Sequence, residues 1–304
     1  MKTAEIHPGI EAAIRPTGWV EPEQDRARLA LVALRDGRIE DAAHHAQGVP
    51  VATSTGRSWK SLLSGLVTIA RGELRYAEAQ LLEASTLACV NALNADQSSQ
   101  MDAWRLAGRT LHHLGWVYRR QDRLAEASHT HLAAHRLRDK WGSPEEIGET
   151  AIELGLDYDL ARNYQEGCRW HRIALQAAKQ AVLDRDRMQA VAWSYLAASC
   201  TDDGRHDEGV SAARSARDSW RAHDIGAVTA AQADVKLGAA LLKQGEVLCD
   251  QVDERAGAVL TEAITWFTAG RDALLAFGGE HTEAARRCDE QIDFARRLLA
   301  TLEE

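Results

Sequence analysis

The sequence predicts an all-α protein built as a solenoid of stacked helix-turn-helix repeats. A phrase of small and large apolar residues returns along the chain, most clearly as Leu114-Gly115-x-x-Tyr118 and Leu154-Gly155-x-x-Tyr158. Only 5 of the 304 residues are proline, which favours long uninterrupted helices. The sequence has no sustained alternation of Val, Ile and Thr with polar residues, so strands are not expected. A period of about 40 residues is typical of stacked helical repeats.

The first helix of each predicted repeat is marked by a small residue that allows another helix to approach closely. These anchor residues are Ala30, Gly65, Gly115, Gly155, Ala197 and Gly238, at spacings of 35, 50, 40, 42 and 41 residues. An apolar residue before the anchor is expected to fill the core, at Leu29, Leu114, Leu154, Leu196 and Leu237. We therefore expect every anchor to be buried.

The second helix of each repeat follows a turn and has its own pattern. The turn residues are Gly37, Gly72, Asp122 and Gly204. Apolar residues then occur at Ile39, Leu74, Leu124 and Tyr164, and small residues at Ala42, Ala77, Ala127, Gly167 and Gly209. This pattern predicts two helices that pack small residues against large ones.

The Leu-Gly pair, the aromatic residue three positions later and the alanine-rich second helix together resemble the tetratricopeptide repeat family. The longer spacing of 40 to 42 residues is similar to the kinesin-light-chain type. The resemblance extends from about Glu23 to Leu302. It implies a right-handed superhelix, a concave groove lined by the first helices, and a protein or peptide partner in that groove.

The repeats divide the chain into three expected parts. Residues 1–22 form an N-terminal arm, 23–278 a solenoid of about six repeats, and 279–304 a C-terminal capping helix that shields the last apolar face. Two segments, Asn91–Gln100 and Gly245–Gly257, interrupt the spacing. Each is interpreted either as a longer loop or as a feature specific to a partner, and the sequence leaves their role open.

Composition narrows the classes of partner and compartment. The formal charge is -9 with a pI of about 5.8, which argues against a nucleic-acid partner. No apolar run reaches the roughly 18 residues of a membrane span, and residues 1–20 lack the pattern of a secretory signal. The five cysteines are far apart and form no CxxC, so we expect a cytoplasmic protein with reduced thiols.

The resemblance places particular side chains in the groove. Ten residues are predicted to form the peptide or ligand site: Arg109, His112, Trp116, Arg119, Arg120, Glu149, Glu153, Asp159, Tyr195 and Lys236. An exposed Trp116 beside two arginines would make a binding hot spot. The structural alternative is that Arg119 and Arg120 pair with Asp157 or Asp159 on the next first helix.

Histidines are concentrated in the third repeat and raise the question of chemistry. His131 and His135 lie four apart on one helix face, a spacing that can hold zinc. However, the sequence has no HExxH, no nucleophile motif and no phosphate-binding loop. We therefore assign no catalytic residue, metal or cofactor. The sequence leaves open whether this repeat binds metal or does chemistry.

The leading functional prediction is a scaffold or adaptor that binds a peptide segment. One alternative is a ligand- or peptide-sensing regulatory module that acts with a partner in trans. Another is a small-molecule enzyme or accessory biosynthetic factor built on the repeats, although the sequence favours a non-enzyme. Self-association through the terminal repeats is also left open, as is the identity of the partner.

Overall fold

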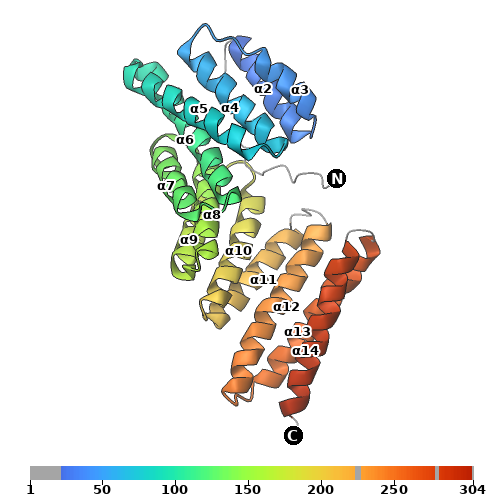
Figure 1. Cartoon of the computed structure of the whole chain (residues 1–304). Coiled ribbons are helices and arrows are strands. Elements are labelled where there is room, and N and C mark those ends of the chain that lie inside the picture. Colours follow the sequence, from blue (N-terminus) through green and yellow to red (C-terminus); the bar gives the residue numbers. More distant parts are fainter. Residues whose placement is uncertain (1–21, 223–226, 278–280, 303–304) are drawn as a thin grey trace. The chain divides into compact units, whose positions relative to one another are not determined.

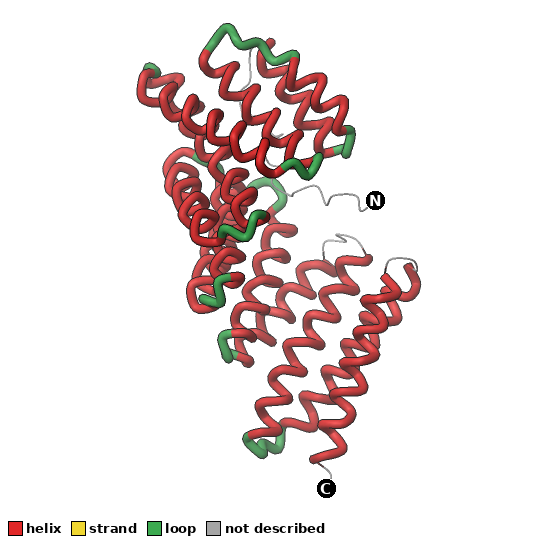
Figure 2. The backbone as a smooth tube through the Cα atoms, viewed as in Figure 1, coloured by secondary structure: helices red, strands yellow, loops and turns green. Residues whose placement is uncertain are grey.

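A computed structural model describes residues 22–222, 227–277 and 281–302, and these residues form thirteen α-helices (Figure 1). The predicted N-terminal arm lies almost wholly outside them. The helices are α2 Pro22–Arg35, α3 Ile39–Gln47, α4 Ser54–Ala70, α5 Leu74–Asn94, α6 Gln97–Arg120, α7 Leu124–Trp141, α8 Pro144–Leu160, α9 Tyr164–Gln180, α10 Arg185–Asp202, α11 His206–Ala222, α12 Ala227–Asp250, α13 Ala256–Phe277 and α14 Thr282–Leu302. Helices and short loops are the only elements that Figure 2 shows in this part of the chain.

The helices pack in the order of the chain, as pairs. Within a repeat, α2 contacts α3, α4 contacts α5, α6 contacts α7, α10 contacts α11 and α12 contacts α13. Successive first helices also touch, as α2 does with α4, α4 with α6, and α10 with α12. The all-α array of sequential helix pairs is therefore confirmed.

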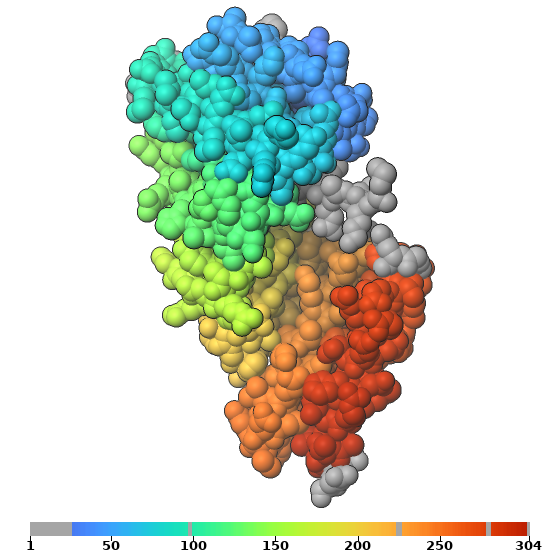
Figure 3. Space-filling view, in the orientation of Figure 1, coloured from blue at the N-terminus to red at the C-terminus, as the bar shows by residue number. Residues whose placement is uncertain are grey.

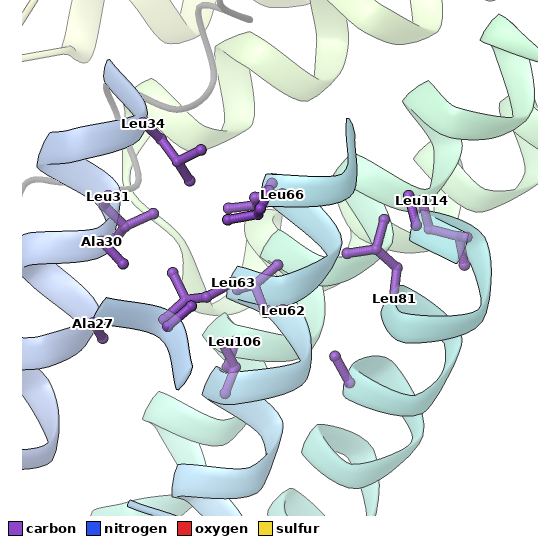
Figure 4. Packing of buried hydrophobic residues seen from close by; sticks show 14 of the residues in the cluster. Ala27, Ala30, Leu31, Leu34, Leu62, Leu63, Leu66, Leu81, Leu106 and Leu114 are labelled. Atoms are coloured by element: carbon purple, nitrogen blue, oxygen red, sulfur yellow. The ribbon is translucent and has the colours of Figure 1, made fainter. Parts of the chain in front are cut away.

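The described residues form two compact units, which meet in sequence between Asp157 and Tyr158, near the end of α8. The first unit has one large apolar core. In Figure 4, Leu31 and Leu34 of α2 face Leu63 and Leu66 of α4. Leu81 of α5 and Leu106 and Leu114 of α6 continue the same cluster. The first helices thus bury their anchor face, as the repeat pattern predicts.

In the second unit, α14 packs against both α13 and α12, and these helices form the orange-to-red surface in Figure 3. This helix covers the predicted capping segment. Its buried residues are Ala285, Cys288, Ile292 and Ala295. An amphipathic last helix of this kind shields the terminal repeat from water. Within the residues that the structure describes, no helix is long and apolar enough to cross a membrane.

All six predicted anchors are buried. One of them shows why the position must be small. A Cβ atom built on Gly115 would lie 2.6 Å from Cδ2 of the His131 ring, so the backbone of α6 passes directly against α7. The expectation for Leu29 is wrong, because this side chain is 41% exposed. At this first repeat the core is filled instead by Ala30 and Leu31.

The turn inside each repeat has the same backbone geometry six times. One residue adopts a left-handed conformation, and the amide that follows it bonds to a carbonyl five residues earlier, at 2.8 to 2.9 Å. The left-handed residues are Gly37, Gly72, Asp122, Arg162, Gly204 and Val252. These bonds are those of the Schellman motif, which satisfies the last carbonyls of a helix and stops it. The four predicted turn residues are among them, and Arg162 and Val252 complete the set.

The two segments that interrupt the spacing are largely helical, so the interpretation as longer loops is wrong. Helix α5 continues to Asn94 and α6 begins at Gln97, where Asp96 caps it by accepting a hydrogen bond from Ser99 N at 2.9 Å. Helix α12 likewise continues to Asp250, and only residues 251–255 form a turn before α13. The extra residues of the two segments therefore lengthen helices.

Candidate functional site

A network of buried charges joins α6, α7 and α8 in the first unit. We call it the ion network, and its members are Arg109, Arg119, Arg138, Glu146, Glu149, Glu153 and Asp157. The carboxylates come from one face of α8. They have this orientation because Glu146, Glu149, Glu153 and Asp157 follow each other at intervals of three or four residues.

The N-terminus of α8 fixes the first of these carboxylates. Ser143 and Glu146 form a capping box, in which Ser143 N donates to Glu146 Oε2 at 3.1 Å and Glu146 N donates to Ser143 Oγ at 3.4 Å. Glu146 Oε1 also accepts from Arg109 Nε at 2.6 Å. Burial opposes ionisation of Glu146, but Arg109 and Arg138 outweigh it and lower the pKa of Glu146 to about 2.

Glu149 has the opposite electrostatic environment. Its Oε2 lies 3.6 Å from Arg138 Nη1, which already donates to the Glu146 carbonyl and to Thr150 Oγ1. Burial is the main cause that raises the pKa of Glu149 to about 8, and Glu146 and Glu153 add to it. The network therefore holds one carboxyl group that favours its protonated form.

The other end of the network fixes a histidine. Arg119 pairs with Glu153, and its Nη1 lies 3.1 Å from Asp157 Oδ1. Nδ1 of His131 on α7 lies 2.5 Å from Asp157 Oδ2, and its Nε2 lies 3.0 Å from the His112 carbonyl oxygen. Each ring nitrogen faces an oxygen atom of a neighbouring helix. His131 is thus a structural core residue that connects three helices.

These contacts show which of the predicted site residues are paired or buried. The structural alternative holds for Arg119, which pairs with Asp157. The expectation that His112 and Glu153 are exposed is wrong, because they are 0% and 9% exposed. They are covered because α8 lies over this part of α6, where Thr150 Oγ1 reaches within 3.4 Å of His112 Nδ1 and Arg119 lies on Glu153.

The remaining predicted residues of the first unit stay accessible. Trp116 is half-buried against the core cluster, and the guanidinium of the exposed Arg120 lies 5.4 Å from the centre of its ring. This cation–π pair, the Trp116–Arg120 patch, is on the surface of the first helix α6. Arg109 and Glu149 are partly exposed at 14% and 18% of their side chains.

In the second unit, Asp159 and Tyr195 are held by one chain of contacts. Asp159 Oδ2 accepts from His171 Nε2 at 3.0 Å and from Ser199 Oγ at 2.7 Å. The His171 ring stacks on Tyr195 at 5.5 Å with an interplanar angle of 19°. Tyr195 has a second neighbour in Lys236, whose Nζ lies 5.9 Å from the centre of the Tyr195 ring. Tyr195 therefore presents a fixed, half-exposed ring beside an ammonium group.

A surface spanning α10 and α12 surrounds this ring, and we call it the Tyr195–Lys236 patch. Matching positions on the two helices pair Tyr195 with Lys236, Ala198 with Ala239, and Asp202 with Lys243. Tyr195 is half-buried and the other five residues are exposed. Of these six residues, Tyr195 and Lys236 are the two that the sequence predicted as site residues.

Two cysteines come together that the sequence showed only as distant residues. Cys168 of α9 and Cys200 of α10 are both fully buried, and their sulfur atoms are 3.2 Å apart as free thiols. Their separation of 32 residues carries no local signal. Among the described residues, no group of three His, Cys, Asp or Glu side chains is placed to hold a metal ion.

The fold is similar to several solved repeat proteins. BtubC (BKLC) from P. vanneervenii has a TM-score of 0.59 and 15% identity, covering 86% of this chain and 94% of that chain. The kinesin light chain TPR-like repeats of Podosopora anserina have a TM-score of 0.50 and 14% identity, covering 68% and 100%. The apo form of the quorum sensor NprR from B. thuringiensis has a TM-score of 0.56 and 11% identity, covering 94% and 90%.

The structural neighbours are therefore tetratricopeptide and kinesin-light-chain-like repeat proteins, as the sequence resemblance predicted. Identities this low support the fold alone. No protein-family model matches the sequence, and no curated protein matches it.

Proposed function

We propose that this protein is an interaction adaptor that binds a peptide segment on the exposed surface of its first helices. One observation carries the proposal. In each unit, that surface presents an exposed cation beside a half-buried aromatic ring, Arg120 over Trp116 and Lys236 over Tyr195. Aromatic rings and arginines are the residues that most often dominate binding energy, because a ring buries a large area and loses little conformational entropy.

The predicted site residues divide into contact and support roles in this proposal. Trp116, Arg120, Tyr195 and Lys236 contact the ligand. Arg109, Glu149 and Asp159 border the contact surface. His112, Arg119 and Glu153 do not contact the ligand. They support the surface, because the ion network fixes the orientation of α6 against α8. A rigid support limits the conformational entropy lost on binding.

The test compares two matched double variants as baits in a pull-down from a lysate of the source organism. Trp116→Ala with Arg120→Ala removes the Trp116–Arg120 patch. Arg75→Ala with Tyr76→Ala removes an exposed arginine and an aromatic residue that is more exposed than Trp116 from α5, a second helix. We expect the first double variant to lose partners that the wild type and the α5 variant both retain. Identical partners for all three baits would reject this surface as the functional site.

A second candidate is a sensing module that acts with a partner in trans. The likeness to NprR, described as a quorum sensor, motivates it. The two candidates share the peptide site and differ in the outcome of binding. A sensor is expected to change its affinity for a second protein when the peptide is present, whereas a simple adaptor is not. Pull-downs with and without a bound peptide distinguish them.

A further inference from the structure

Two charged residues of the Tyr195–Lys236 patch form no ion pair within the part of the chain that the structure describes. Among the described residues, no carboxylate lies within ion-pair distance of Lys236, and no lysine or arginine lies within that distance of Asp202. The nearby Lys243 is different, since its Nζ is 2.9 Å from Glu246 Oε2. Within the described residues, Lys236 and Asp202 are therefore unpaired charges of this surface, one of each sign, although Lys243 acts on Asp202 at longer range.

The surroundings act against both charges. Partial desolvation lowers the pKa of the Lys236 ammonium group. Burial, and then the neighbouring Asp159, raises the pKa of Asp202, while Lys243 opposes this shift. A ligand that supplies an anion to Lys236 and a cation to Asp202 would relieve both effects. Complementary charges of this kind fix the register of a partner more than they add affinity.

The helix positions set the distance between the two charges. Asp202 lies seven residues after Tyr195 on α10, and Lys236 occupies the position on α12 that matches Tyr195. Seven residues advance about 10 Å along a helix and return to the same face. The ligand charges must therefore be separated by about 10 Å along the direction of the first helices.

Only small exposed side chains lie between the two charges along these helices. Ala198 and Ala239 are the residues between them, both exposed, and neither side chain extends beyond a methyl group. The Tyr195 ring stands at one end and is backed by His171. An extended chain can lie on such a floor and pack against the ring, which is how aromatic surfaces bind polyproline II segments.

We propose that the Tyr195–Lys236 patch binds a peptide segment in the polyproline II conformation that carries an acidic and a basic residue three positions apart. This conformation repeats every three residues with a rise of about 3.1 Å per residue, so the two side chains share a face about 9 Å apart. In a β-strand the same two side chains would point to opposite faces. The acidic residue binds Lys236 and the basic residue binds Asp202. The inference rests on the proposed peptide-binding function and adds the ligand chemistry for the second unit.

The probe is the acetylated and amidated peptide Pro-Pro-Glu-Pro-Pro-Lys-Pro-Pro, titrated into the full chain and followed by calorimetry or NMR. We expect Lys236→Glu to weaken its binding at least tenfold. The same variant should bind Pro-Pro-Lys-Pro-Pro-Lys-Pro-Pro, which the wild type binds poorly. Asp202→Lys should show the reciprocal preference for Pro-Pro-Glu-Pro-Pro-Glu-Pro-Pro. Both positions are exposed, and unchanged helicity by circular dichroism confirms that each variant folds.

Three outcomes would overturn the inference. These are equal binding of the first peptide to the wild type and Lys236→Glu, failure of the charge-swapped peptides to bind the matching variants, and tighter binding of a helical peptide with Glu and Lys seven residues apart. Loss of partners through the Trp116 and Arg120 double variant is a separate measurement. If that loss occurs while the wild type binds none of the peptides, the proposed function stands and only this inference fails.

Discussion

Arg119 Nη1 lies 3.1 Å from Asp157 Oδ1 in a largely buried contact, whereas the neighbouring Arg120 is exposed over Trp116. Two consecutive arginines on α6 thus have different physical roles. The first neutralises carboxylates inside the protein. The second presents a cation to solvent.

This difference predicts opposite effects of the same substitution. Arg119→Ala should lower the free energy of unfolding by about 3–5 kcal/mol, because Glu153 and Asp157 would remain buried without their partner. Arg120→Ala should change it by less than about 0.5 kcal/mol. Urea denaturation of the two variants at one pH measures both. Equal stability of Arg119→Ala and the wild type would show that the ion network is not formed in solution.

Glu149 predicts a dependence of stability on pH. Its pKa is about 8 in the folded protein, against a reference of 4.5, so the folded state holds this proton more tightly. The resulting stabilisation is fully present below about pH 4.5 and is lost as the pH rises to about 8. Glu149→Gln should keep a neutral side chain at every pH and exceed the wild type by about 1–3 kcal/mol above pH 8.

Urea unfolding of Glu149→Gln and the wild type at several pH values between 5 and 8.5 tests this expectation. The exposed Glu73→Gln is the control, and it should retain the wild-type slope. Parallel curves for Glu149→Gln and the wild type would contradict the shifted pKa.

The turn at Val252 predicts a stabilising substitution. Val252 has a φ of 54°, where a β-branched side chain is strained, and it is 88% exposed. Val252→Gly should therefore raise the stability by about 0.5–1 kcal/mol, the relief of strain being partly offset by unfolded-state entropy. Gly204→Val makes the reverse change at the matching turn and should cost about 1–2 kcal/mol. Thermal unfolding checks both signs, and a lower melting temperature for Val252→Gly would refute the argument.

The close contact between Gly115 and His131 predicts that adding one methyl group at Gly115 lowers the free energy of unfolding. Gly115→Ala places a Cβ atom 2.6 Å from the His131 ring and forces the ring away from Asp157. We expect a loss of about 1–3 kcal/mol. Gly257→Ala is the matched control, since the nearest atom is Leu299 Cδ2 at 3.9 Å and a helical alanine should stabilise by about 0.4–1 kcal/mol. Similar melting temperatures for the two variants would mean that α6 and α7 do not approach so closely.

The repeat architecture could be predicted from the sequence because its determinants are local and periodic. Anchors such as Gly115 and Gly155 recur at intervals of about 40 residues, and Gly37, Gly72 and Gly204 mark turns by their conformational freedom. Arg162 and Val252 adopt the same turn without a glycine, so composition gave no signal for them. The helical extensions at Asn94 and Asp250 were missed because polar helix turns resemble loops in composition.

The candidate site was less predictable because burial depends on what the next helix contributes. Trp116, His112 and Arg119 all lie on the predicted face of α6, but α8 covers His112 and encloses Arg119. The capping box at Ser143 fixes where α8 begins and therefore which carboxylates meet α6. The Cys168–Cys200 approach depends on the packing of two helices and has no local pattern.

The six left-handed turns have a consequence for how such a chain can change in length. Each pair of helices carries its own stop signal, encoded in the few residues around one turn. A duplicated segment of one repeat would carry its own turn residues, and the neighbouring repeats would not need to change their sequence. Growth by duplication, or extension of the array in the laboratory, is therefore possible one repeat at a time, with the ends of the inserted helices already specified.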